Sequence, residues 1–240
     1  MEMSQLKSLV MGNKLQSAWA LLHMSYLFLS FWFYIPYFGW NVVAYHRPLK
    51  VSMILYAFST YTELGMPQFN REYLRKMLDS GNTHFLLYSI IFIIDDETRL
   101  GAALWPLFVY STFQVFNWVK LSFVPAVAPS VAAEFRSFEL TRMFEQMRQP
   151  ALVMAADLEV KLFFIILVFA ILGLFGVGNQ QLAGVFFYYQ LLRLRYRVSP
   201  ETQRSVAMTK HTVDGYLYSA RCPEMIRNLY VKALTWVGYV

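Results

Sequence analysis

The feature that most constrains this chain is a run of about 23 residues, Ala18 to Trp40, that carries no formal charge. A secretory signal would have an apolar core of only about 7–15 residues, followed by small residues at a cleavage site. This run is longer, and it ends in the aromatic-rich residues 37–40, which suit a membrane interface. We therefore predict an uncleaved first membrane span behind a polar N-terminal segment, residues 1–17.

The composition agrees with a chain whose solvent is partly lipid. Apolar residues make up 57% of the sequence and charged residues 15%, against about 25% charged in a typical soluble domain. This excludes disorder, collagen and nucleic-acid-binding tails, and it makes the lipid bilayer the expected partner, with no nucleic acid. A single cysteine, Cys222, excludes a disulfide framework and a cysteine-based zinc site.

Further apolar segments follow at about 51–66, 84–94, 101–119, 162–176 and 182–192. The segment 51–66 is shorter than the roughly 20 residues that cross a bilayer, so we expect it to lie in the interface or to return as the second arm of a shallow hairpin. The segments 84–94 and 101–119 would form another hairpin around the acidic residues 95–97, with a kink at Pro106. The fold class is thus an all-α integral membrane protein with a membrane domain over residues 18–192.

Residues 129–149 are predicted to form an amphipathic connector. Basic and acidic residues alternate there at steps of three from Arg136 to Arg148, which favours a water-facing helix. Gln149 and Pro150 predict a break or kink. The expected buried stripe consists of Leu140, Met143, Phe144, Met147 and Ala151.

The remaining residues, 193–240, form a basic tail that we expect to be cytosolic. From residue 191 onward eight basic and three acidic side chains give +5 of the net charge of +6, and basic segments stay on the cytosolic side. Arg193, Arg195 and Arg197 directly follow an apolar run, so they are expected to snorkel to lipid headgroups.

A short basic amphipathic helix is predicted to begin at Pro223 and to reach Val237. Its apolar face repeats at helical spacing, and its basic residues lie elsewhere on the helix. The stripe would contact a membrane surface or a partner, or it would pack on the protein's own helices. The predicted contact residues of the whole tail are Arg193, Arg195, Arg197, Ile226, Arg227, Leu229, Tyr230 and Lys232.

Sequence patterns for catalysis and cofactor binding are absent. The histidines, at positions 23, 46, 84 and 211, have no metal-ligand spacing. The glycines at 173, 176 and 178 lie at an apolar segment rather than in a phosphate loop, so they indicate close packing or a hairpin bend. The apolar cores 18–40, 101–119 and 162–176 contain no ionisable group of the kind that marks a carrier. We expect no enzyme activity, no cofactor and no metal.

Four segments together resemble a known family. They are Asn13-Lys14-Leu15, residues 84–92 (HFLLYSIIF), residues 187–192 (FYYQLL) with Leu194-Arg195-Tyr196, and Cys222-Pro223. Their order and spacing are similar to those of the transmembrane protein 33 family, also called Krüppel homologue two. The resemblance covers about residues 12 to 238, and it rests on the ordered set because no single motif is unique.

The resemblance implies a multi-pass protein of the endoplasmic reticulum and nuclear envelope. It implies roles in tubular network shape, nuclear pore organisation, calcium homeostasis and stress signalling, through partners such as reticulon-type proteins, nuclear pore components and channels. The sequence therefore favours a membrane-shaping or scaffolding protein. The alternative is a transporter or channel subunit of the endoplasmic reticulum, and a lipid-modifying enzyme ranks third.

Overall fold

The computed structural model describes residues 14–35, 42–94, 100–176, 182–218, 222–225, 227, 228, 231 and 232, and its regular structure there is helical throughout. This confirms the predicted all-α class. The α-helices are α2 (Lys14–Tyr34), α3 (Val42–Leu64), α4 (Arg71–Asp79), α5 (Gly81–Ile94), α6 (Leu104–Trp118), α7 (Val124–Val127), α8 (Ala132–Ser137), α9 (Glu139–Leu174), α10 (Leu182–Val198) and α11 (Pro200–Leu217). Short 3-10 turns, η1 (Gly101–Ala103) and η3 (Pro129–Val131), and a π-helical segment, η2 (Val119–Phe123), connect some of them.

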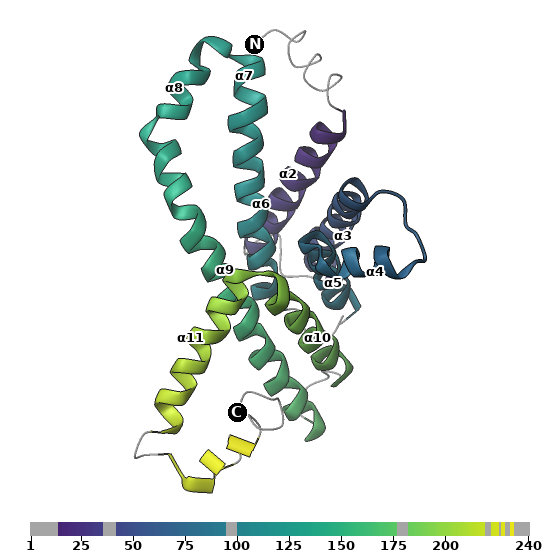
Figure 1. The fold of residues 1–240 in the computed structure, drawn as a ribbon, viewed down its shortest axis with the longest axis vertical. Helices are drawn as coiled ribbons and strands as arrows, with labels where there is room; N and C mark the ends of the chain where they lie inside the picture. Colours follow the sequence, from purple (N-terminus) through teal and green to yellow (C-terminus); the bar gives the residue numbers. More distant parts are fainter. Residues whose placement is uncertain are drawn as a thin grey trace.

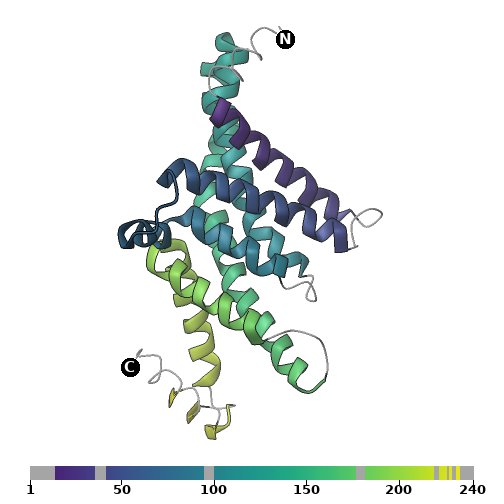
Figure 2. The same ribbon diagram turned by 90° about the vertical axis from the view of Figure 1, so that its right-hand side faces the viewer.

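The helices pack as successive antiparallel neighbours rather than as one parallel-sided bundle. Helix α3 lies between α2 and α5, while α6 packs on α2 and α9, and α10 packs on α5 and α9 (Figure 1). The C-terminal ends of α2, α5 and α9 point to the same side as the first residues of α3 and α10 (Figure 2). Helix α6 crosses these helices at an angle (Figure 2). It does not lie along α5, so α5 and α6 do not form the simple second hairpin that the sequence predicted.

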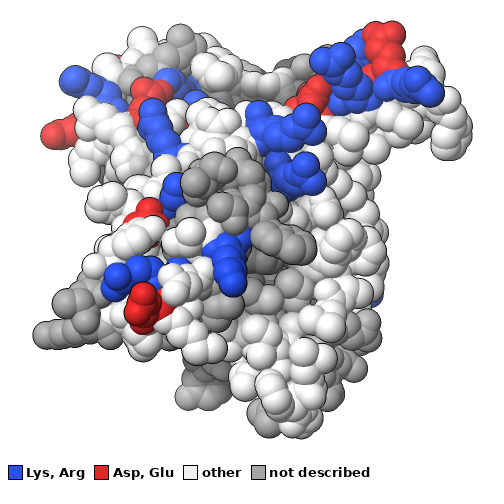
Figure 3. All heavy atoms as spheres, turned by 60° about the horizontal axis from the view of Figure 1, so that its bottom comes forward, with Lys and Arg blue, Asp and Glu red and all other residues white. Residues whose placement is uncertain are grey.

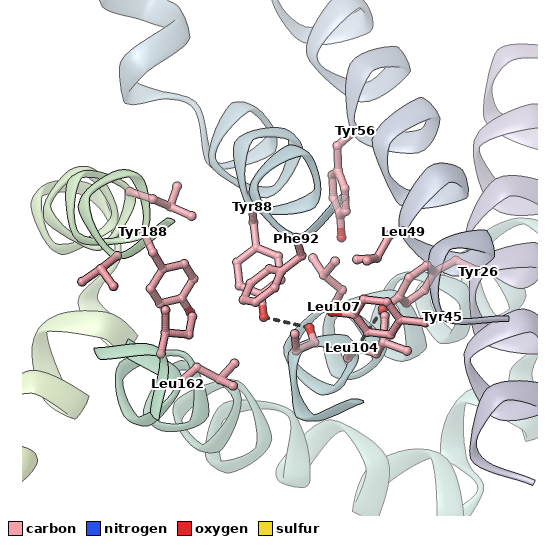
Figure 4. Packing of buried hydrophobic residues seen from close by; sticks show 14 of the residues in the cluster. Tyr26, Tyr45, Leu49, Tyr56, Tyr88, Phe92, Leu104, Leu107, Leu162 and Tyr188 are labelled. Atoms are coloured by element: carbon pink, nitrogen blue, oxygen red, sulfur yellow. Dashed lines mark hydrogen bonds between the residues drawn. The ribbon is translucent and has the colours of Figure 1, made fainter. Parts of the chain in front are cut away.

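Buried tyrosines connect the helices at the centre. The Tyr26 and Tyr88 hydroxyls donate to the carbonyl oxygens of Leu104 and Ala103, over 2.8 and 2.7 Å (Figure 4). From the end of α2, Tyr34 donates to the Gly101 carbonyl over 2.7 Å. Each tyrosine packs an apolar ring and satisfies its polar tip on a backbone acceptor. The start of α6 is consequently held by both α2 and α5.

Smaller polar pairs connect further helices. A 2.8 Å hydrogen bond joins the Ser52 and Ser89 hydroxyls, of α3 and α5. In a second pair, His23 of α2 lies 3.1 Å from the Ser111 hydroxyl of α6. Polar side chains of this kind join helices whose outer surfaces face lipid, because apolar contact alone adds little there.

Several helix boundaries differ from those that the sequence predicted. Helix α3 begins at Val42 and runs through Pro48. Helix α9 continues through Pro150, so of the break or kink expected there the break is wrong. Pro106 lies in the first turn of α6, where a proline interrupts no hydrogen bond, so the expected kink inside the helix is wrong too. The acidic residues 95–97 lie outside the described residues.

The connector 129–149 is not one helix. Phe138 adopts an extended conformation (φ −60°, ψ 135°) that separates α8 from α9. Of the expected buried stripe, Met143 and Met147 are exposed, while Phe144 packs on Phe113 and Phe116 of α6. The first half of α9 extends away from the bundle (Figure 1). Other helices can therefore cover only the side chains on one side of this half.

None of the described helices is both long enough and apolar enough to cross a bilayer on its own. Helix α2 ends at Tyr34, so it covers only part of the span that was predicted over residues 18–40. Helices α4 and α5 together pass the same test, but they meet at a bend of 79°.

Replacing the central hydroxyl tests how the start of α6 is held. We expect Tyr88→Phe to lower the free energy of unfolding by about 0.5–1.5 kcal/mol, because the Ala103 carbonyl loses one donor while the ring still packs. Thermal unfolding in detergent micelles measures the change. The control is Tyr189→Phe, whose side chain is 40% exposed; equal effects at the two positions would contradict the assigned hydrogen bond.

Candidate functional site

The three arginines that follow the last apolar segment have different environments. Arg193 and Arg197 are exposed, as expected of headgroup contacts. Arg195 is only 3% exposed, and its Nε lies 2.7 Å from Oε2 of the fully buried Glu159. The prediction that Arg195 snorkels to headgroups is wrong, because its side chain points into the protein and is paired there.

Aromatic side chains enclose the Arg195 guanidinium. Its Cζ lies 4.3 Å from the ring centroid of Phe85, on α5, and its Nη2 donates to the Tyr110 hydroxyl, on α6, over 3.1 Å. The two rings also contact each other, with centroids 4.5 Å apart. Stacking on the π-face and a buried carboxylate are the two environments that suit a desolvated guanidinium. This site therefore joins α5, α6, α9 and α10.

Helical periodicity explains why both charges lie inside. On α10 the buried residues Val185, Tyr188, Leu191 and Arg195 follow steps of three and four, so Arg195 continues the apolar stripe. On α9, Glu159 occupies the same kind of position ahead of Leu162 and Ile166. The Tyr188 hydroxyl donates to the Glu159 backbone carbonyl over 3.0 Å. This hydrogen bond is a second contact between α10 and α9, in addition to the Arg195–Glu159 ion pair.

A second polar contact ties the next helix to the same region. Helix α11 packs along α9, and its Ser205 hydroxyl donates to Asp157 over 3.4 Å. Asp157 also pairs with Lys161, over 2.6 Å. The boundary predicted at residues 192 and 193 therefore does not separate two units, because α10 runs across it to Val198 and α11 belongs to the packed fold.

An uncharged apolar surface extends from this site along α9 and α10. Charged side chains crowd the upper edge and the left of one face of the molecule, and its lower right is free of them (Figure 3). No Asp, Glu, Lys or Arg occurs from Leu162 to Leu174 or from Leu182 to Leu192. The exposed apolar residues on these two arms are Phe164, Ile165, Val168, Phe169, Ile171, Leu172, Leu174, Leu182, Phe186 and Phe187. A patch of this extent marks a membrane or protein contact.

Gly176 terminates the first of these arms. Its φ of 78° lies in the left-handed region, and its N–H donates to the Gly173 carbonyl over 3.0 Å. This conformation favours glycine and ends a helix. Gly176 thus ends the helix, while the hairpin bend that was one of the two predicted roles of these glycines falls on residues 177–181, which include Gly178 and lie outside the described residues.

The C-terminal contact residues are placed only in part. The described residues 224, 225, 227, 228, 231 and 232 are helical, whereas Ile226, Leu229 and Tyr230 lie outside the described residues. The Nε of Arg227 donates to the Leu217 carbonyl, at the end of α11, over 3.2 Å. Arg227 therefore contacts the chain itself, and whether it and Lys232 also contact a membrane stays a prediction.

Two features of the structure, Glu159 and helix α4, were not predicted from the sequence. Glu159 has no motif, although its position in a helical stripe with Leu162 and Ile166 was a usable signal. Helix α4 was not predicted, although its charged and apolar residues separate cleanly around nine positions. Within the described part of the chain no cluster of three metal-ligating side chains occurs.

The fold and its surface define an all-helical protein of the integral membrane class. The family model for Transmembrane protein 33/Nucleoporin POM33 matches residues 1–239. Similar proteins include Tetra-spanning protein 1 of Schizosaccharomyces pombe, 23% identical over 85% of this chain and 73% of its own, and mouse Transmembrane protein 33, 25% identical over 95% and 90%. The Transmembrane protein 33 homolog of Dictyostelium discoideum is 24% identical over 91% and 69%. No solved structure gives a significant match.

The chain therefore belongs to the Transmembrane protein 33/Nucleoporin POM33 family, as the ordered segments predicted. It is an integral membrane protein of a family with a link to the nuclear pore.

Removing one member of the buried pair tests the site. We expect Arg195→Ala to lower the free energy of unfolding by about 3–5 kcal/mol, because Glu159 is left buried without a counter-charge. The exposed Arg193→Ala is the matched control, and it should change little. The double variant Arg195→Met with Glu159→Leu should recover most of the loss, since no charge stays buried. Unfolding in detergent micelles measures all three variants, and equal losses for Arg193→Ala and Arg195→Ala would contradict the pairing.

Proposed function

We propose that this protein shapes or scaffolds the membrane of the endoplasmic reticulum and nuclear envelope, without enzymatic activity. The observation that carries the proposal is the shortness of the exposed apolar arm. From Leu162 to Leu174 a helix rises only about 20 Å, against about 30 Å for the hydrocarbon core. An arm of this length reaches past one leaflet but does not cross both.

The hairpin's shape supports a wedge that acts on curvature. The uncharged arms of α9 and α10 would occupy more area in the leaflet they enter than in the other. Their charged bases, with Lys161 on one arm and Arg193 on the other, would stay at the headgroups. The buried Arg195–Glu159 pair would fix the angle between the arms, so that the wedge keeps its shape when the membrane resists.

In this proposal the basic tail lies in the cytosol, and tubular network shape, nuclear pore organisation and modulation of reticulon-type proteins follow from membrane shape and partner contacts. Effects on calcium homeostasis and stress signalling would be indirect, through partner channels. The names of the relatives support the membrane and nuclear pore setting.

Reconstitution separates shaping from transport. The purified chain is added to giant vesicles that carry a calcium dye, and vesicle shape and dye signal are followed together. We expect tubules or constrictions without ion flux, and Arg195→Ala should reduce tubulation while still inserting. Smooth vesicles at full protein incorporation would count against the proposal.

A transporter or channel subunit is the second candidate, and one observation favours it. Ionisable groups buried near membrane segments mark ion or proton pathways in many carriers, and Glu159 is fully buried. Flux that falls with Glu159→Gln, or with a change at Asn117, a polar residue of α6, would support this candidate. Against it, Arg195 already neutralises Glu159 and is enclosed by two aromatic rings.

The tail's position gives a topology test. We expect the C-terminus to be cytosolic, because net positive segments resist translocation. An engineered glycosylation site after residue 200 should therefore remain unmodified in microsomes, and a site inserted at residue 97 serves as the comparison. Modification after residue 200 would show that the tail faces the lumen.

The final helix gives a membrane-binding test. A peptide of residues 221–240 should bind small anionic vesicles better than large neutral ones, because packing defects admit apolar side chains and charge adds attraction. Salt should weaken binding, and so should Leu229→Glu or the pair Arg227→Glu with Lys232→Glu. If the peptide ignores vesicles while the Leu229→Glu protein is degraded, the helix belongs to the folded core.

A further inference from the structure

Helix α4 lies at the side of the bundle (Figure 1), and part of its apolar face is exposed. Tyr73 and Met77 are half-buried, while Leu74 and Leu78 are 46% and 42% exposed. The segment before the helix adds Met66 and a fully exposed Phe69. The helix therefore contacts the protein through one part of its apolar arc and leaves the other part open.

The opposite face of α4 is charged and internally paired. Lys76 lies 2.7 Å from Glu72, and Arg75 lies 3.9 Å from Asp79, both at i, i+4 spacing. The hydrogen bond and charge of Lys76 hold the pKa of Glu72 below its ordinary value. The charges occupy one arc and the apolar side chains the other, which is the pattern of a helix that lies in a membrane interface.

A rigid elbow sets the direction of the helix. Glu63, at the end of α3, accepts hydrogen bonds from the Ser80 hydroxyl over 2.6 Å and from the Asn82 amide over 2.9 Å. The Nε2–H of His84, in α5, donates to the Leu78 carbonyl over 2.7 Å. These bonds hold the 79° bend between α4 and α5, so the apolar arc of α4 is presented in one fixed direction.

Helix α4 is unsuited to continue a span from α5. Five of its nine residues are charged, and each such side chain is costly inside hydrocarbon. Because α4 meets the first turn of the uncharged α5 at 79°, it does not extend the axis of α5.

We propose that α4 is an interfacial anchor, with Phe69, Leu74 and Leu78 inserted into the acyl boundary of one leaflet. The ligand is the apolar layer beneath the headgroups of any lipid, because α4 carries three basic and two acidic side chains, four of them paired with one another. The anchor requires membrane residence, which the family establishes, but no shaping activity. It is also separate from the tail helix, whose binding is expected to depend on anionic lipid.

The single cysteine makes a direct depth measurement possible. In a Cys222→Ser background, Phe69→Cys, Leu74→Cys and Arg75→Cys are each labelled with an environment-sensitive fluorophore in the full-length protein. Each protein is reconstituted into vesicles of neutral phosphatidylcholine. Arg75→Cys is the matched control, since it lies beside Leu74 on the charged arc.

We expect labels at 69 and 74 to show blue-shifted emission and at least about twofold stronger quenching by shallow nitroxide lipids than the label at 75. Aqueous iodide should give the reverse order, and high salt should change neither. Equal iodide quenching at all three positions would overturn the anchor by placing α4 in water. Shielding of 69 and 74 from both quenchers, with cross-links between copies, would overturn it in favour of a second copy of the chain.

Discussion

Lipid outside the molecule removes the usual drive for helices to associate, and among the described residues the helices are joined by hydrogen bonds and by one buried ion pair, Arg195–Glu159. An apolar side chain gains little by leaving hydrocarbon for a protein interior. Tyrosine hydroxyls that reach backbone carbonyls, as Tyr26 and Tyr88 do at the start of α6, gain a partner that lipid cannot supply. Each contact also has a defined direction, so it fixes register as well as proximity.

The Arg195–Glu159 pair is the most deeply buried ion pair among the described residues. It joins α10 to α9, and the Tyr110 contact joins Arg195 to α6, while the preceding residues of α10 pack into the core. A well-packed apolar replacement could be as stable. The pair instead disfavours a misaligned packing of α9 and α10, because separating the two charges inside the protein is costly.

The sequence was sufficient for the fold class and the family, since these depend on composition and order. It was insufficient where the outcome depends on which side of a helix a residue lies. Arg193, Arg195 and Arg197 look alike in sequence, yet two residues turn a helix by about 200° and four by about 40°, so Arg195 faces opposite to the other two. That geometry, together with the Val185, Tyr188 and Leu191 stripe, would have placed Arg195 inside. No sequence pattern identified Glu159 as its partner, because the two are 36 positions apart and their pairing depends on how α9 meets α10.

Short helical elements were also hard to predict from the sequence, because tertiary contacts decide their direction. A nine-residue helix such as α4 is marginal on its own in water, and only the elbow at Glu63 and His84 makes its direction definite. The same holds for the α9–α10 arms, which are too short to be independent spans. In both cases polar contacts hold an element that packs one apolar face on the protein and leaves another apolar face exposed. In the proposed scaffold function, these exposed faces would meet the bilayer while the Arg195–Glu159 pair keeps one arrangement. The buried charges of a carrier, by contrast, must change partners to work.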